Sequence, residues 1–150
     1  MTRPEQARES RGFAAVLVIV YGIFALSATA RAGVQILEKF SHAPVAYLLS
    51  LLAALTYIVA TVLLARRRGG RGAALAVCCG ELAGVVAVGT LSVLDPSLFP
   101  DASVWSVFGA GYGFVPLLLP IIAIAYLLRA RRKDLRAASG ASAGLRSSRG

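Results

Sequence analysis

The sequence has 150 residues, of which 57% are hydrophobic, and its mean hydropathy is +0.73. Soluble proteins average roughly 45–50% apolar residues, and a soluble domain of this size would leave much of that surface in water. The composition therefore favours a single domain embedded in a lipid bilayer. The formal net charge of +9 does not indicate a nucleic-acid-binding protein, because the basic residues gather in short segments outside the apolar runs.

Four long apolar runs follow one another along the chain, and each predicts a transmembrane helix. At about 1.5 Å per residue each run can cross a hydrocarbon core of about 30 Å, although the first must tilt or continue past Arg31. We therefore expect an all-α fold, an antiparallel four-helix transmembrane bundle. The predicted helices comprise residues 13–30, 43–65, 72–94 and 105–128.

The first run allows two alternatives. Its basic start and its Ala28-Thr29-Ala30 end resemble a secretory signal peptide, and cleavage there would leave three helices. The run is long for the apolar part of such a signal, which favours a retained helix. The segment that follows, residues 31–42, mixes apolar and polar residues, so either the first helix projects beyond the bilayer or a short helix lies in the interface.

Segments rich in basic residues occupy both chain ends and the connection between the second and third predicted helices. They precede the first run, fill the RRRGGR loop at 66–71 and follow the fourth run, while the other two connections hold only Arg31 and Lys39. The positive-inside rule therefore predicts that both chain ends lie in the cytoplasm. We expect residues 1–12 to form a cytoplasmic segment and residues 129–150 a basic, disordered tail.

These basic segments also predict contacts with anionic lipid headgroups, at about 1 kcal/mol per residue near the surface. The residues expected to anchor the protein are Arg66, Arg67, Arg68, Arg71, Arg129, Arg131, Arg132 and Lys133.

Glu81 is the one acidic residue inside an apolar run. It lies nine residues after Gly72, roughly 13 Å into the membrane, where an ionised carboxylate must be either protonated or partnered. Counting from the cytoplasmic ends of the other runs places Tyr21 and Tyr57 near the same depth. We consider two hypotheses: a proton-coupled carboxylate in a transporter, and a structural hydrogen bond that holds the third helix in the bundle.

Small residues recur four apart in the third and fourth runs, at Gly80 and Gly84 and at Gly109 and Gly113. Such spacing lets helix backbones approach closely, so these glycines are expected at helix-packing faces, within the bundle or against a partner.

The fourth run also contains Pro116 and Pro120, one turn apart, which predict a kink in that helix. Just before them, Trp105, Phe108 and Tyr112 lie where an aromatic belt at the membrane surface is expected.

No pattern of catalytic or metal-binding residues stands out. Cys78 and Cys79 are adjacent in an apolar run, which favours buried packing, and His42 has no companion ligands. We expect no catalytic residue, no metal, no cofactor and no enzymatic activity.

Three stretches resemble a family of uncharacterised small actinobacterial integral membrane proteins. They are VYGIFALSATARAGVQI (20–36), APVAYLLSLLAALTYIVATV (43–62) and GELAGVVAVGTLSVLDPSLFPDASVWSVFGAGYGFVPLLLP (80–120), and DPSLFPDASVWS is the most specific part. The resemblance implies a plasma-membrane location and no particular activity.

The leading hypothesis is a non-enzymatic accessory subunit or scaffold of a membrane assembly, because paired charges are lacking and small residues recur on the helices. The alternative is a small proton-coupled transporter or channel that uses Glu81. Expected partners are the lipid bilayer and either a second copy of the chain or another membrane protein, with no nucleic acid.

Overall fold

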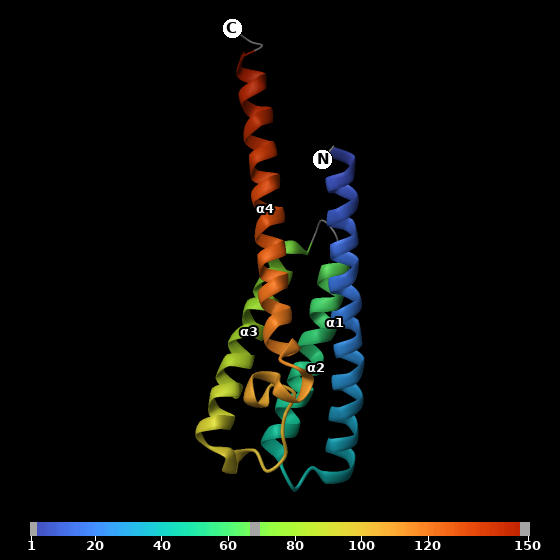
Figure 1. Cartoon of the computed structure of the whole chain (residues 1–150), viewed down its shortest axis with the longest axis vertical. Helices are drawn as coiled ribbons and strands as arrows, with labels where there is room; N and C mark the ends of the chain where they lie inside the picture. Colours follow the sequence, from blue (N-terminus) through green and yellow to red (C-terminus); the bar gives the residue numbers. More distant parts are fainter. Residues whose placement is uncertain (1–2, 67–69, 148–150) are drawn as a thin grey trace.

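The computed structural model describes residues 3–66 and 70–147, and this part of the chain is all-α, without strands. The four long helices are α1 (Arg3–Lys39), α2 (Pro44–Ala65), α3 (Arg71–Leu94) and α4 (Val115–Ser147). Two short 3₁₀ helices, η1 (Pro96–Leu98) and η2 (Ser106–Tyr112), lie between α3 and α4 (Figure 1). The predicted all-α fold is confirmed for these residues.

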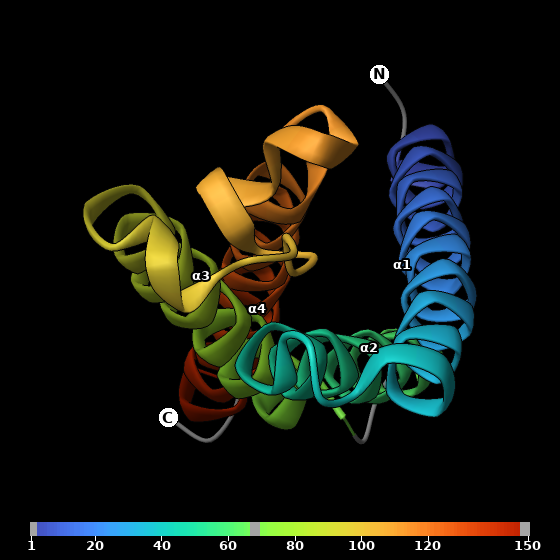
Figure 2. The same ribbon diagram turned by 90° about the horizontal axis from the view of Figure 1, so that it is seen from below.

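The long helices stand side by side. The two chain ends lie at one end of the molecule, and the α1–α2 and α3–η1 connections lie at the other (Figure 1). Contacts are richest between α1 and α2 and between α3 and the pair formed by α4 and η2. Seen from below, the helices follow an arc from α1 through α2 and α3 to α4 (Figure 2).

Aromatic pairs bridge the two ends of this arc. The rings of Phe13 and Tyr126 have centroids 5.4 Å apart, and those of Phe24 and Tyr112 are 6.1 Å apart. These contacts join α1 to α4 and to the end of η2, where the backbones themselves touch little.

Three described helices are long and apolar enough to cross a membrane: α1 from Arg11 onward, α2 and α3. A fourth span is added if η2 and the following part of α4, which meet at an angle of 99°, are counted together. The predicted membrane character of the chain is therefore supported by length and composition.

The first helix is longer than the predicted 13–30. It continues through Arg31 to Lys39, so the first helix does project beyond its apolar run and no separate interfacial helix forms. A turn at 40–43 then precedes α2, whose first residue is Pro44, where the missing backbone N–H has no helical partner to lose.

The predicted fourth helix, 105–128, is wrong over residues 105–114, because α4 begins only at Val115. Residues 106–112 form η2, in which Val107, Phe108 and Gly109 have left-handed backbone angles, and Gly113 and Phe114 are also left-handed. The segment contains glycines at 109, 111 and 113, which weaken an α-helix and readily adopt positive φ. Hydrophobicity alone therefore extended the predicted helix too far.

The sharp bend lies between Tyr112 and Val115, before both prolines that were expected to produce a kink. Pro116 lies in the first turn of α4, where a missing N–H costs little, and Pro120 lies inside the helix. The cause of the bend is the left-handed glycine-rich segment rather than either proline.

The tail also differs from the prediction. The described residues 129–147 continue α4 as a helix instead of being disordered. Alanine recurs at 137, 138, 141 and 143, and alanine is the strongest helix former. Arg67 and Arg68 lie outside the described residues, as do residues 1–2 and 148–150.

The core between the helices is built from small residues and a few large polar aromatics. Small side chains let α1 and α2 approach closely. The small residues buried along these two helices are Ala25, Ala28, Ala32, Ala46, Ser50, Ala53, Ala54 and Ala60. The largest fully buried side chains include Tyr21, Tyr47, Tyr57 and Glu81.

Candidate intramembrane carboxyl site

The Glu81 carboxyl group lies in the interior of the helix arc. Its side chain is 1% exposed, and its Oε2 accepts a hydrogen bond of 2.8 Å from the hydroxyl of Tyr21. The donor comes from the middle of α1 and the acceptor from the middle of α3, at the shared depth that residue counting predicts. The structure therefore brings together two of the three residues expected in this site.

The second carboxyl oxygen of Glu81, Oε1, has no hydrogen-bond partner among the described residues, although it is buried. Buried polar atoms in proteins are nearly always paired, because an unpaired one costs free energy in a medium without water. The carboxyl group therefore has one oxygen held by Tyr21 and one that accepts no hydrogen bond from the described residues.

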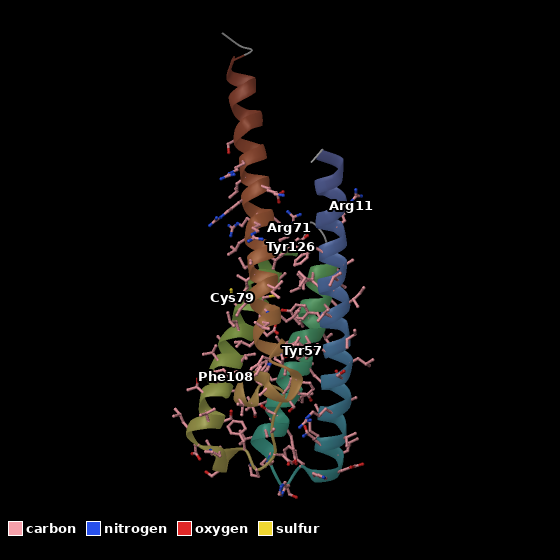
Figure 3. The ribbon with its side chains drawn as sticks, in the orientation of Figure 1. Arg11, Tyr57, Arg71, Cys79, Phe108 and Tyr126 are labelled. Atoms are coloured by element: carbon pink, nitrogen blue, oxygen red, sulfur yellow. The ribbon has the colours of Figure 1, made fainter. Side chains whose placement is uncertain are left out.

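Tyr57 of α2, the third expected residue, has a different partner. Its hydroxyl accepts a hydrogen bond of 3.1 Å from the indole Nε1 of Trp105, and its ring centroid lies 6.2 Å from that of Tyr21. Among the described residues it makes no hydrogen bond to Glu81. Tyr57 thus packs beside the Tyr21–Glu81 pair and connects it to the segment before η2. Figure 3 shows Tyr57 in the middle of the bundle.

Cys78 lies one turn before Glu81 on α3 and is fully buried. Its Sγ is 3.6 Å from the Tyr21 hydroxyl, and either atom can be the donor. The Tyr21 hydroxyl therefore has two polar neighbours on the same face of α3. Cys79, the next residue, is exposed.

Trp105 was expected in an aromatic belt at the membrane surface, and the structure shows instead that it is 3% exposed in the core. Gly84 of α3 leaves room for the Trp105 ring because it has no side chain: a Cβ added to Gly84 would lie 2.8 Å from Trp105 Cζ3. Sequence reasoning missed this role because a tryptophan next to a polar loop has the same pattern whether its ring faces lipid or the core.

The expected packing glycines divide into two groups. Gly84 is packed against Trp105, whereas a Cβ on Gly80 would meet nothing within 4 Å. Gly109 and Gly113 lie in the left-handed segment and not on an α-helical face, and Gly109 is packed against Pro116. The tightest glycine was missed: at Gly89 a Cβ would lie 2.5 Å from Phe108 Cδ1.

Polar contacts also hold the end of the molecule opposite the chain termini. The Tyr47 hydroxyl donates a hydrogen bond of 2.5 Å to Asp101 Oδ2, and this bond holds the pKa of Asp101 below its usual value of 3.8. The Arg31 guanidinium donates to the Tyr112 hydroxyl at 3.2 Å and to the Ala102 carbonyl at 2.9 Å. The loop between α3 and α4 is thereby fastened to α1 and α2.

Within the described ranges, no three His, Cys, Asp or Glu side chains gather as metal ligands. No protein-family model, no curated protein and no solved structure matches the chain. What the Glu81 site does must therefore follow from its own chemistry.

Proposed function

We propose that the protein is a plasma-membrane protein with four spans and both ends in the cytoplasm, and that it is a small proton-coupled transporter or channel. In this proposal Glu81 is the group that takes up and releases the proton. The supporting observation is the fully buried Glu81 carboxyl group, with Oε2 held by Tyr21 and Oε1 without a partner in the described part of the chain. Ionisable groups inside membranes mark proton relays in pumps and transporters.

A purely structural role accounts for only one of the two oxygens. The bond from Tyr21 uses one acceptor oxygen, Oε2, to join α1 to α3. The second oxygen adds a desolvation cost that a structural cross-link does not require. A protonatable group, in contrast, needs an oxygen that is not permanently occupied.

The broken fourth span supports the same proposal. Irregular backbone is tolerated at membrane depth only where protein buries it or where it lines a cavity, and discontinuous helices mark the binding sites of many transporters. Here η2 and α4 meet at 99°. Tyr112, the last residue before the break, packs its ring against Phe24, and Phe24 packs against Tyr57. The Tyr57 ring neighbours that of Tyr21, which donates to Glu81, so a chain of contacts runs from the break to Glu81.

The test uses purified protein in liposomes that contain a pH-sensitive dye, with an imposed potassium diffusion potential as the driving force. We expect proton flux with the wild-type protein, loss of flux with Glu81→Gln, and unchanged flux with Glu38→Gln, since Glu38 is exposed near the end of α1. In parallel, the infrared carboxyl band that disappears in Glu81→Gln should titrate reversibly with pH.

Two outcomes would overturn the proposal. One is a Glu81→Gln protein that conducts protons as the wild type does. The other is a Glu81 carboxyl band that does not change with pH, which would make the residue a fixed structural group.

The accessory subunit remains a second candidate, and a separate observation favours it. Of the most apolar stretch in each of α1, α2 and α3, only 22%, 28% and 33% of the residues are buried within the chain. Most of the spanning surface is therefore available to another membrane protein. This candidate commits to a different membrane protein as the partner, and no enzymatic activity is proposed for either candidate.

A further inference from the structure

The η2 segment, residues 105–114, contains residues whose backbone conformation is unfavourable for them. Val107, Phe108 and Phe114 have φ angles of 49°, 59° and 59°. For residues other than glycine this left-handed region brings the Cβ atom too close to the following carbonyl oxygen, and a β-branched residue such as valine is a genuine outlier there. The segment is therefore held under backbone strain.

The side chains of the strained residues offset little of this strain. Val107 is 45% exposed and Phe114 is 47% exposed, so neither is held in place by complete burial. Phe108 is half-buried and packs against Gly89 of α3. The left-handed conformation of the η2 segment must therefore be maintained largely by contacts with other helices.

Hydrogen bonds to the long helices hold the η2 segment in place. The backbone N–H of Val107 donates to the Ser92 hydroxyl of α3 at 2.8 Å. The Trp105 indole donates to the Tyr57 hydroxyl of α2 at 3.1 Å. A third bond joins the last residue of η2 to α1. A small number of hydrogen bonds thus opposes the strain of the segment.

The glycine-rich end of the η2 segment has free space beside it. The segment packs against α3 and α4 (Figure 2). Gly111 and Gly113 are exposed, and a Cβ added to either one would have no atom of the described residues within 4 Å. The segment can therefore move on this side without displacing another helix.

The inward side of the η2 segment covers the surroundings of Glu81. The Trp105 ring packs against Gly84, one turn after Glu81 on α3. Its indole is bonded to Tyr57, whose ring centroid lies 6.2 Å from that of Tyr21, the donor to Glu81. Since α3 runs away from the end that holds the chain termini (Figure 1), Trp105 covers Glu81 on the side of the opposite end.

We propose that the η2 segment is a gate with two positions. In the closed position, which the structure shows, the left-handed residues are strained and Trp105 fills the space beside Gly84. In the open position the bond to Ser92 is broken, the strain is relieved and Trp105 leaves the interior, so that water reaches Glu81 from the end opposite the chain termini. The role of the gate in transport rests on the function proposed for Glu81, whereas the movement itself does not.

The experiment measures quenching of Trp105 fluorescence by acrylamide together with proton flux, both in the liposomes of the flux test. Trp105 is the only tryptophan in the sequence, so the fluorescence reports on this residue alone. Val107→Gly should favour the closed position, because glycine adopts a left-handed φ without strain. We expect a proton flux about fivefold lower than that of the wild type, and quenching no stronger than in the wild type.

Val107→Ala is the matched control. It removes the same branched side chain but keeps the Cβ that makes a left-handed φ unfavourable, so it should change the flux much less than Val107→Gly does. Ser92→Ala removes the acceptor of the Val107 N–H and should favour the open position, with stronger quenching of Trp105 and a larger flux. Adding Glu81→Gln to Ser92→Ala should abolish that flux, which distinguishes gate opening from a leaky, misfolded protein.

The gate and the proposed transport function fail on different results. Equal flux in the wild type, Val107→Gly and Val107→Ala, in a protein whose flux still requires Glu81, would overturn the gate and leave the function in place. Absence of flux in the wild type would overturn the function alone, and stronger quenching in Ser92→Ala would then still support the gate. Quenching of Trp105 that Ser92→Ala leaves unchanged would overturn the gate in either case.

Discussion

At the scale of single residues, the Tyr47–Asp101 bond has a consequence that depends on pH. The pKa of Asp101 is lowered in the folded protein because the Tyr47 hydroxyl donates to its carboxylate. A lowered folded-state pKa stabilises the fold at pH above the unfolded pKa of about 4, and this contribution is lost as pH falls through the folded pKa. The bond therefore stabilises the protein at neutral pH and ceases to do so in acid.

We predict that the melting temperature of the wild-type protein in mild detergent decreases as pH falls from about 5 to about 3. Tyr47→Phe should decrease the melting temperature at neutral pH and flatten the dependence in that range. Asp101→Asn, which removes the titrating group itself, should flatten it as well. Parallel acid curves for all three proteins would contradict this account of Asp101.

Residue depth could be predicted in this protein, whereas the direction of each side chain could not. Glu81 and Tyr21 meet because both lie about eight or nine residues inside an apolar run, and a helix rises by a fixed amount per residue. Tyr57 has the same depth, yet its hydroxyl is bonded to Trp105. Rotation of a helix about its axis depends on its neighbours, and a featureless apolar run holds little information on it.

At the scale of the helical elements, α3 depends on its glycines to different degrees. A Cβ at Gly89 would lie 2.5 Å from Phe108 Cδ1 and 2.7 Å from the Phe108 backbone nitrogen, which cannot move away easily. We predict that Gly89→Ala destabilises the protein by about 1–3 kcal/mol, the usual cost of overpacking. Thermal unfolding in detergent measures the change.

Gly80→Ala is the matched control on the same helix. Nothing lies within 4 Å of a Cβ at that position, so the substitution should be neutral or should stabilise α3 by up to about 1 kcal/mol through helix propensity. Equal losses at both positions would mean that η2 does not pack into α3 as described.

The elements themselves were predictable where the apolar pattern is uninterrupted. The predicted 43–65 and 72–94 agree closely with α2 and α3. The start of the fourth span was not predictable. Residues 105–114 are as apolar as the residues of a membrane-spanning helix, while their glycines allow left-handed backbone angles. The sequence GAGYG at 109–113 predicts a helix-packing face, whereas in the structure it precedes the bend between η2 and α4.

At the scale of the whole molecule, the two candidate functions differ in what the chain assembles with. The chain has a mass of 15.6 kDa. A transporter of four spans should purify as copies of this chain alone, because several copies are needed to enclose a path. We therefore predict that native mass measurement after mild extraction from its own membrane gives a multiple of the chain mass.

A stoichiometric second protein in the same measurement would instead support the accessory subunit, and the partner would then define the activity. Detergent and lipid adducts are distinguished by repeating the measurement after exchange into a second detergent. Retention of a second protein in both detergents would contradict the transporter proposal.

Hydropathy predicts which segments are long and apolar enough to cross a membrane. It does not predict that the helices are arranged in an arc. Charge alternation predicts which connections share a side of the membrane, but it holds no information on which helices touch. The bridging pairs Phe13–Tyr126 and Phe24–Tyr112 join parts of the chain that are far apart in sequence. Such contacts depend on the complete packing and leave no local signal.

The inward position of Trp105 also sets an order in which the protein is completed during synthesis. The chain emerges from its N-terminus, so α1, α2 and α3 are available before residue 105 exists. Until then the space beside Gly84 is unfilled, and the Tyr57 hydroxyl lacks the hydrogen bond that the Trp105 indole later donates. The segment from Trp105 to Gly113 therefore closes this part of the interior only after the first three helices exist, and a chain that ends before residue 105 leaves the space around Tyr57 unfilled.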